Sequence, residues 1–108
     1  MTPILNSALL GLMEQAGTAV ATLIEGLTQE ELLRSRLTRA EVLRQLKTLA
    51  DSAGQVAPSA RRDMPELDWD GWDAMRPRFS ATAGEALDEA LWFACESLVP
   101  ATLLWMRV

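Results

Sequence analysis

The sequence predicts an all-α fold, an antiparallel four-helix bundle with one or two additional short helices. Apolar residues recur at helical spacing along most of the chain, and no segment shows the strict alternation of a strand. At three expected helix starts a threonine is followed three residues later by glutamate, the pattern of an N-terminal capping box. With 108 residues, 49% of them hydrophobic, the chain has the size and apolar content of one domain, so we expect a single domain over residues 1–108.

The first helix is expected between Ile4 and Leu27, with Gly26 closing it. Its apolar residues form two adjacent stripes, so that only a narrow strip remains polar and the apolar surface is wider than one neighbouring helix pair would cover. One interpretation is a subunit interface. Its candidate residues are Leu10, Met13, Gly17, Val20 and Ile24. The other is a four-helix core that wraps this helix from two sides, and the pattern alone favours neither.

Two capping boxes define the next helices. Thr28 with Glu31 starts a short helix that ends near Ser35, and Thr38 with Glu41 starts a long one that should end at Pro58. The second half of the long helix is rich in small residues that would let a neighbouring backbone approach closely: Ala50, Ala53, Gly54 and Ala57. The polar segment from Pro58 to Pro65 is expected to be a connection within the domain.

The remaining helices are shorter. Asp68 can cap a helix that carries Trp69, Trp72 and Met75, and Pro77 should end that helix at Arg76. After a loop over residues 78–81, a third capping box starts the next helix, whose box and apolar stripe are Thr82, Glu85, Leu87, Leu91, Ala94 and Leu98.

The sequence after this stripe should return the chain to the bundle. Pro100 is expected to end or kink the helix, because proline has no N–H and its ring crowds the preceding turn. A last short helix, Ala101–Met106, would then carry Leu104 and Trp105 onto the bundle.

Composition excludes several kinds of chemistry. The chain has no histidine, which excludes catalytic triads, imidazole-based acid–base catalysis and the usual zinc ligand sets. A net charge of −5 argues against broad binding to a phosphate backbone. A local basic patch on one face remains open, and its candidates are Arg61, Arg62, Arg76 and Arg78.

Neither a cofactor nor a metal is expected. Glycine-rich phosphate loops are absent, and the acidic residues Glu66, Asp68, Asp70 and Asp73 do not have the spacing of a calcium-binding EF-hand loop. We interpret them as helix caps and solvated surface. The tryptophans are interpreted as core or interface anchors, since no basic groove accompanies them.

The expected compartment is the cytoplasm. Cys95 is the only cysteine, so no internal disulfide can form, and it is interpreted as a buried, inert thiol. The N-terminus lacks the pattern of a secretion signal, and Glu14 with other polar residues interrupts the most apolar stretch, so no membrane segment is expected.

Five segments carry a likeness to a known family. They are Gly26–Glu31, Thr38–Leu46, Pro65–Trp69 leading to Met75 and Arg76, Leu91–Trp92 and Val99–Pro100. In order and spacing, from about Leu9 to Leu104, the chain resembles the HepT branch of the HEPN ribonuclease-fold families. That resemblance implies an antiparallel helical bundle, usually a homodimer, encoded beside a small nucleotidyltransferase antitoxin and acting as a metal-independent RNase toxin.

The family's catalytic motif is degenerate here. It consists of an arginine usually followed by asparagine, a histidine five residues after the arginine, and a tyrosine two residues further on. Counted from Arg76, these places are occupied by Pro77, Ala81 and Ala83. The missing histidine implies the loss of acid–base help worth about 10²–10⁴-fold in rate. The missing tyrosine is where the partner enzyme attaches AMP, so activity and its control are absent together.

Three hypotheses follow. The first is a catalytically degenerate HepT-like protein that acts by association, as a homodimer or with a nucleotidyltransferase-type partner. The second is an active toxin RNase with a diverged site built from Arg76, Arg78 and an acid, Glu85 or Asp88. The third, a small-molecule binder that uses the tryptophans, has no support beyond their presence. For Arg76 itself the alternative is structural: an arginine at a helix C-terminus that pairs with Asp73.

Overall fold

The computed structural model describes residues 3–80 and 84–107, and every regular element in these ranges is helical. In chain order they are α1 (Pro3–Ile24), α2 (Gln29–Arg34), α3 (Arg36–Gln55), α4 (Pro58–Asp63), α5 (Trp69–Arg78), α6 (Glu85–Phe93), the π-helical turn η1 (Ala94–Leu98) and α7 (Val99–Met106). The all-α prediction is confirmed.

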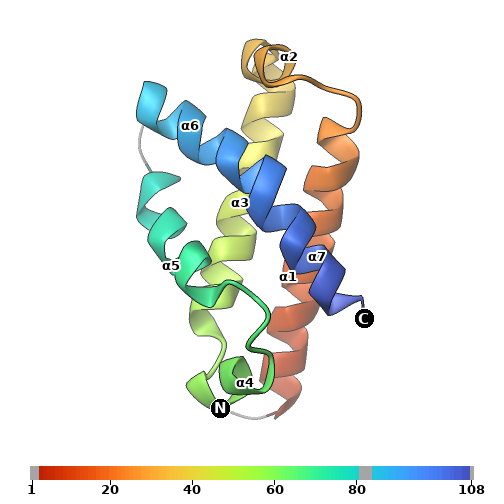
Figure 1. Cartoon of the computed structure of the whole chain (residues 1–108), viewed down its shortest axis with the longest axis vertical. Helices are drawn as coiled ribbons and strands as arrows, with labels where there is room; N and C mark the ends of the chain where they lie inside the picture. Colours follow the sequence, from red (N-terminus) through yellow and green to blue (C-terminus); the bar gives the residue numbers. More distant parts are fainter. Residues whose placement is uncertain (1–2, 81–83, 108) are drawn as a thin grey trace.

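The long helices α1 and α3 lie side by side and run in opposite directions, and the other main helices pack across them (Figure 1). α5 packs on α3, whereas α6, η1 and α7 form a nearly continuous rod whose end packs on α1. Between these layers lies the core, where the largest fully buried side chains include Met13, Val20, Leu32, Leu46, Leu49, Trp72, Phe79 and Leu91. A bundle with additional short helices is what the apolar stripes predicted.

Of the predicted capping boxes at Thr28 and Thr38, the structure contains the first but not the second. Thr28 forms a complete capping box: its hydroxyl accepts from the N–H of Glu31 at 3.2 Å, and the Glu31 carboxylate accepts from the N–H of Thr28 at 2.9 Å. The prediction of a capping box at Thr38 is wrong. α3 begins at Arg36, directly after α2, so Thr38 lies inside the helix. Ser35 alone separates the two helices, as the C-cap of α2 and the N-cap of α3.

The loops on either side of the bundle use glycine. Gly26 follows α1 with a φ of +77°, a backbone conformation that favours glycine, which confirms it as the residue that closes the helix. Thr82 lies outside the described residues, and α6 begins at Glu85 after Gly84, whose φ is +110°.

Two prolines behave differently from the prediction. Pro58 starts α4 and does not terminate α3, which ends at Gln55; proline suits a first helical turn, where its missing N–H needs no partner. Pro77 does not stop α5, which continues to Arg78. The N–H of Phe79 still donates to the carbonyl of Met75 at 3.0 Å, and Phe79 is fully buried, so packing holds the end of α5 in place.

The expected break at Pro100 is replaced by η1. A π-helical turn takes up an extra residue before the proline, and the N–H of Val99 donates to the carbonyl of Ala94. This extra residue rotates the following helix, so that Val99, Thr102 and Leu103 face the core. The prediction that Leu104 and Trp105 pack onto the bundle is therefore wrong: they are 62% and 45% exposed.

The apolar surface of α1 is largely used within the chain. Met13, Gly17 and Val20 are buried, so their assignment to a subunit interface is wrong. α3 and α7 cover them from two sides: a Cβ placed on Gly17 would lie 3.1 Å from Leu103 and 3.6 Å from Leu49. Leu10 and Ile24 are half-buried against the same core.

In length and composition, the stretch Ile4–Ile24 of α1 is also suited to crossing a membrane. Core helices of soluble proteins and signal sequences share this property, so it does not identify a membrane span. Its burial against α3 and α7 accounts for its apolar residues on the inner side.

Candidate functional site

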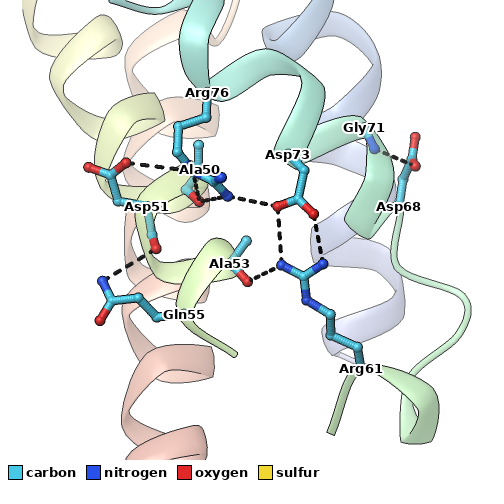
Figure 2. Close-up of polar contacts among 9 residues, drawn as sticks. All are labelled: Ala50, Asp51, Ala53, Gln55, Arg61, Asp68, Gly71, Asp73 and Arg76. Carbon is cyan, nitrogen blue, oxygen red and sulfur yellow. Dashed lines mark hydrogen bonds and ion pairs between the residues drawn. The ribbon is translucent and has the colours of Figure 1, made fainter. Parts of the chain in front are cut away.

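The motif arginine, Arg76, lies across the C-terminal half of α3 (Figure 2). Its Nη2 donates to Asp73 Oδ1 at 2.7 Å and to the carbonyl oxygen of Ala50 at 2.9 Å, and its Nε donates to the same carbonyl at 3.1 Å. A second carboxylate, that of Asp51, lies 3.8 Å from Nε. The guanidinium is thus held by contacts within the chain.

A second arginine, Arg61 on α4, meets the same aspartate from the other side (Figure 2). Its Nη1 donates to Asp73 Oδ2 at 2.8 Å, and its Nη2 donates to Asp73 Oδ1 at 3.1 Å and to the carbonyl of Ala53 at 2.7 Å. The guanidinium also lies 5.2 Å from the ring centre of Trp69. One carboxylate therefore joins two arginines. We name Arg61, Asp73 and Arg76 the arginine clamp.

The position of the clamp follows from the C-terminal half of α3. Carbonyls near a helix C-terminus carry partial negative charge and attract cations. The small side chains of Ala50 and Ala53 leave their carbonyls accessible to the guanidinium groups. Gly54 completes the surface, because a Cβ there would overlap the guanidinium of Arg76. The sequence predicted that a neighbouring backbone would approach these small residues, whereas at Ala50, Ala53 and Gly54 it is the side chains of Arg61 and Arg76 that do so.

The clamp changes the titration of its members. Hydrogen bonds from Arg61 hold the pKa of Asp73 at about 2, below its ordinary 3.8, with a further contribution from Arg76 and against the opposing effect of burial. The same hydrogen bonds raise the pKa of Arg61. Asp73 is therefore ionised at neutral pH and remains so down to about pH 4.

Replacement of Gly54 with alanine tests the fit between α3 and Arg76. Alanine in place of an exposed helical glycine ordinarily stabilises a helix by about 0.5–1 kcal/mol. At Gly54 the added methyl would displace the guanidinium from Asp73 and Ala50, so we expect a net loss of about 1 kcal/mol in the free energy of unfolding, measured with urea.

Gly11 supplies the matched control, since it is also helical and exposed but a Cβ there meets nothing within 4 Å. Gly11→Ala should show the ordinary gain. An equal gain at Gly54 would show that Arg76 is not held against α3 in solution.

The other predicted site residues are not part of the clamp. Arg62 and Arg78 are exposed, and within the described ranges neither forms an ion pair, so only two of the four candidate arginines share a partner. Pro77 lies inside α5, and Ala81 and Ala83 fall outside the described residues. Of the acids considered for a diverged RNase site, Asp88 pairs with Arg39 of α3, and Glu85 is exposed at the start of α6.

A comparison with protein-family models, curated proteins and solved structures found no match. The resemblance to HepT proteins therefore stays a prediction.

The acidic tract after Pro65 is used for structure. Asp68 caps α5 as predicted, accepting from the N–H of Gly71 at 2.9 Å, and Asp73 belongs to the clamp. In the part of the chain that the structure describes, no three Cys, Asp or Glu residues come together as metal ligands would. Cys95 is buried in η1, and burial raises the pKa of its thiol to about 12, as expected of an inert thiol.

Two of the tryptophans anchor the core, as predicted. Trp72 is fully buried, and its indole N–H donates to the hydroxyl of Thr102 at 3.0 Å. Trp69 is nearly buried, and its indole N–H donates to the carbonyl of Met64 at 2.9 Å. A cavity of about 600 Å³ beside Trp69 is lined by Arg61, Arg62, Pro65, Glu66, Leu67, Asp68, Trp69 and Asp70. Five of these eight residues are charged, whereas pockets that bind small molecules usually contain only a few polar groups.

Proposed function

We propose that this chain is a catalytically degenerate, HepT-like protein of the cytoplasm that acts by association, with a second copy or with a nucleotidyltransferase-type partner. The observation that carries the proposal is the state of Arg76. It is the one motif residue that remains, and its guanidinium is engaged by Asp73 and the carbonyl of Ala50.

An RNase of this kind would need Arg76 to meet a phosphate. Asp73 and the carbonyl of Ala50 take up Nε and Nη2 of Arg76, so a phosphate that approached the remaining Nη1 would lie beside the negative charges of Asp73 and Asp51. Like charges at this distance repel, which opposes phosphate binding. Without histidine anywhere in the chain, Arg76 would also lack the family's acid–base partner.

Association is supported by large apolar side chains that the fold leaves uncovered. Phe93, Leu104 and Trp105 on the C-terminal rod are each close to half exposed or more. Exposed aromatic and aliphatic side chains on one helix are typical anchors of protein interfaces.

RNA cleavage decides between association and catalysis. Incubation of structured and single-stranded RNA with wild type and with Arg76→Ala is expected to give no cleavage by either, because Asp73 and the carbonyl of Ala50 engage Arg76 and the chain has no histidine for the family's acid–base step. Products are measured on denaturing gels, and circular dichroism checks that the variant is folded. Cleavage by wild type that is lost in Arg76→Ala would overturn the proposal in favour of a diverged RNase.

Association is tested separately. Light scattering and cross-linking measure self-association, and a pull-down from the protein's own host measures other partners. A monomer that recovers no partner would contradict the proposed function.

A further inference from the structure

One side of the C-terminal rod, from α6 through η1 to α7, is not covered by the rest of the described chain. Phe93 is 46% exposed, Leu104 62% and Trp105 45%, whereas the opposite side of the rod packs on α1 and α5. Figure 1 shows the rod across the front of the molecule, with no described helix over it. We call this side the C-terminal face, and its exposed apolar residues are Phe93, Pro100, Ala101, Leu104 and Trp105.

The unpaired charges along the same rod are negative. Residues 79–106 include four acidic residues and no lysine or arginine. One of the four, Asp88, is paired with Arg39 of α3. The other three are exposed and form no ion pair among the described residues: Glu85, Glu89 and Glu96. Arg107, which follows the rod, donates from Nη2 to the hydroxyl of Thr18 on α1 at 2.8 Å and is not paired with these acids.

The acidic and apolar residues share one surface. Glu89 lies one turn before Phe93 on α6, and Glu96 lies about one turn after it in η1. Pro100 and Leu104 then follow Glu96 at a spacing of four, so that they lie in one row along the rod. The large apolar side chains of the C-terminal face are therefore bordered by carboxylates.

This charge pattern disfavours several occupants of the face. A phosphate backbone or an anionic lipid surface would meet unpaired carboxylates of the same sign. A second copy docked face to face would bring its own three acids, and the net charge of each chain is −5. The charge that complements the face is positive, and it must come from a different molecule.

We propose that the C-terminal face binds an amphipathic helix of another protein, with large apolar side chains on one side and lysine or arginine residues beside them. This inference rests on the proposed function, because it names the surface of the association and the chemistry of the partner. Phe93 and Trp105 are 12 residues apart, about 18 Å along the rod. A partner helix of about four turns would therefore contact both.

The apolar and acidic residues contribute differently to this binding. Phe93, Leu104 and Trp105 supply apolar area that leaves water when the partner binds. Ser97 and Ala101 are small, exposed and lie between the two aromatic residues, so the partner helix can approach closely there. The carboxylates select a basic partner over an acidic one and accelerate its encounter with the face.

Two synthetic helical peptides test the proposal. The probe carries leucines at a spacing of three and four with lysines beside them, and in the matched control peptide glutamates replace the lysines. Fluorescence anisotropy of the labelled peptide measures the dissociation constant. Wild type should bind the lysine peptide at least about tenfold more tightly than the glutamate peptide, because like charges repel the latter. Added salt should reduce this difference, since it screens exposed charges.

Variants locate the site of binding. Glu89→Lys combined with Glu96→Lys should weaken binding of the lysine peptide about tenfold. Glu25→Lys combined with Asp63→Lys changes the net charge equally, at exposed acids elsewhere that form no ion pair in the described chain, and should leave the affinity within about twofold.

A second pair of variants tests the apolar contact. Leu104→Ser should also weaken binding about tenfold, because it removes an exposed apolar anchor. Leu37→Ser is the control, at a leucine of α3 that is 85% exposed, and should leave the affinity unchanged. Circular dichroism checks that each variant is folded.

The outcomes separate this proposal from the proposed function. Absence of binding by the lysine peptide, equal binding of the two peptides, or equal weakening by the two charge-reversed pairs would overturn the proposed partner. Self-association of wild type that Leu104→Ser abolishes would overturn it as well, because a second copy would then cover the face. In each case the proposed function would stand as long as light scattering, cross-linking or the pull-down detects an association.

Discussion

Replacing Trp72 with alanine is expected to lower the free energy of unfolding by about 3–5 kcal/mol, the largest effect of any single change proposed for this protein. Trp72 is completely buried at the centre of the bundle, and its removal would leave a cavity between α5 and α7. The change would also leave the buried hydroxyl of Thr102 without its indole donor. Urea unfolding followed by circular dichroism measures the loss.

Two further variants separate packing from hydrogen bonding. Trp72→Phe keeps most of the ring but not the N–H, so a smaller loss of about 1–2 kcal/mol is expected. Leu37→Ala removes a large side chain that is 85% exposed and should change stability by less than about 0.5 kcal/mol. If Trp72→Ala were no more destabilising than Leu37→Ala, the core described for α5 and α7 would be wrong.

The helices were predictable because their signals are local. Apolar spacing, the box of Thr28 with Glu31 and the cap at Asp68 each lie within one or two helical turns, and the structure contains all of them. The false signals were also local. Thr38 has the sequence of a cap, but the chain enters α3 two residues earlier, and Pro77 is tolerated because the buried Phe79 holds the end of α5.

The apolar residues of a helix do not by themselves predict which part of the protein packs against them. The wide apolar surface of α1 was consistent with a second subunit or with two helices of the same chain, and only the fold places Leu49 and Leu103 against Gly17. The exposed residues of α7 were missed for a related reason. Their orientation depends on the extra residue in η1, for which Pro100 was the only signal, and it suggested a break.

In the candidate site, too, the contact within one helix was predictable and the contacts between helices were not. Arg76 and Asp73 lie three residues apart on one helix, so their pairing followed from helical spacing, and the structure confirms it. Arg61 and the carbonyls of Ala50 and Ala53 come from other helices, and no local pattern places them at Asp73. Gly54 was the available clue, since a glycine inside the last turn of a helix can indicate that another group approaches closely.

Two polar contacts hold α5 in different ways. The indole of Trp72 binds Thr102 inside the core, whereas the arginine clamp fixes the outer side of α5 to α3 and α4. Since the clamp also holds Arg76, the residue that the resemblance marks as catalytic contributes here to stability.

Replacing Asp73 with alanine should therefore lower the free energy of unfolding by about 2–3 kcal/mol. The change would leave two neighbouring guanidinium groups without their shared carboxylate, and their charges would repel. The loss stays below that of a fully buried pair because 37% of the Asp73 side chain is exposed to solvent, which screens the charges. Urea unfolding near pH 7 measures this loss. The free energy of unfolding of Asp73→Asn should lie between those of wild type and Asp73→Ala, because asparagine keeps an acceptor oxygen but has no charge.

The pH dependence of the free energy of unfolding tests whether the charge of Asp73 causes this stabilisation. The pKa of Asp73 is about 2 in the folded protein and 3.8 in its ordinary state, so the stabilisation is present above about pH 4 and is lost as the pH falls towards 2. Wild type should lose more stability than Asp73→Ala over this interval. Asp63→Ala is the control, because Asp63 is an exposed aspartate at the end of α4 that forms no ion pair among the described residues. Equal pH profiles for wild type and Asp73→Ala would show that the carboxylate does not hold the two arginines in solution.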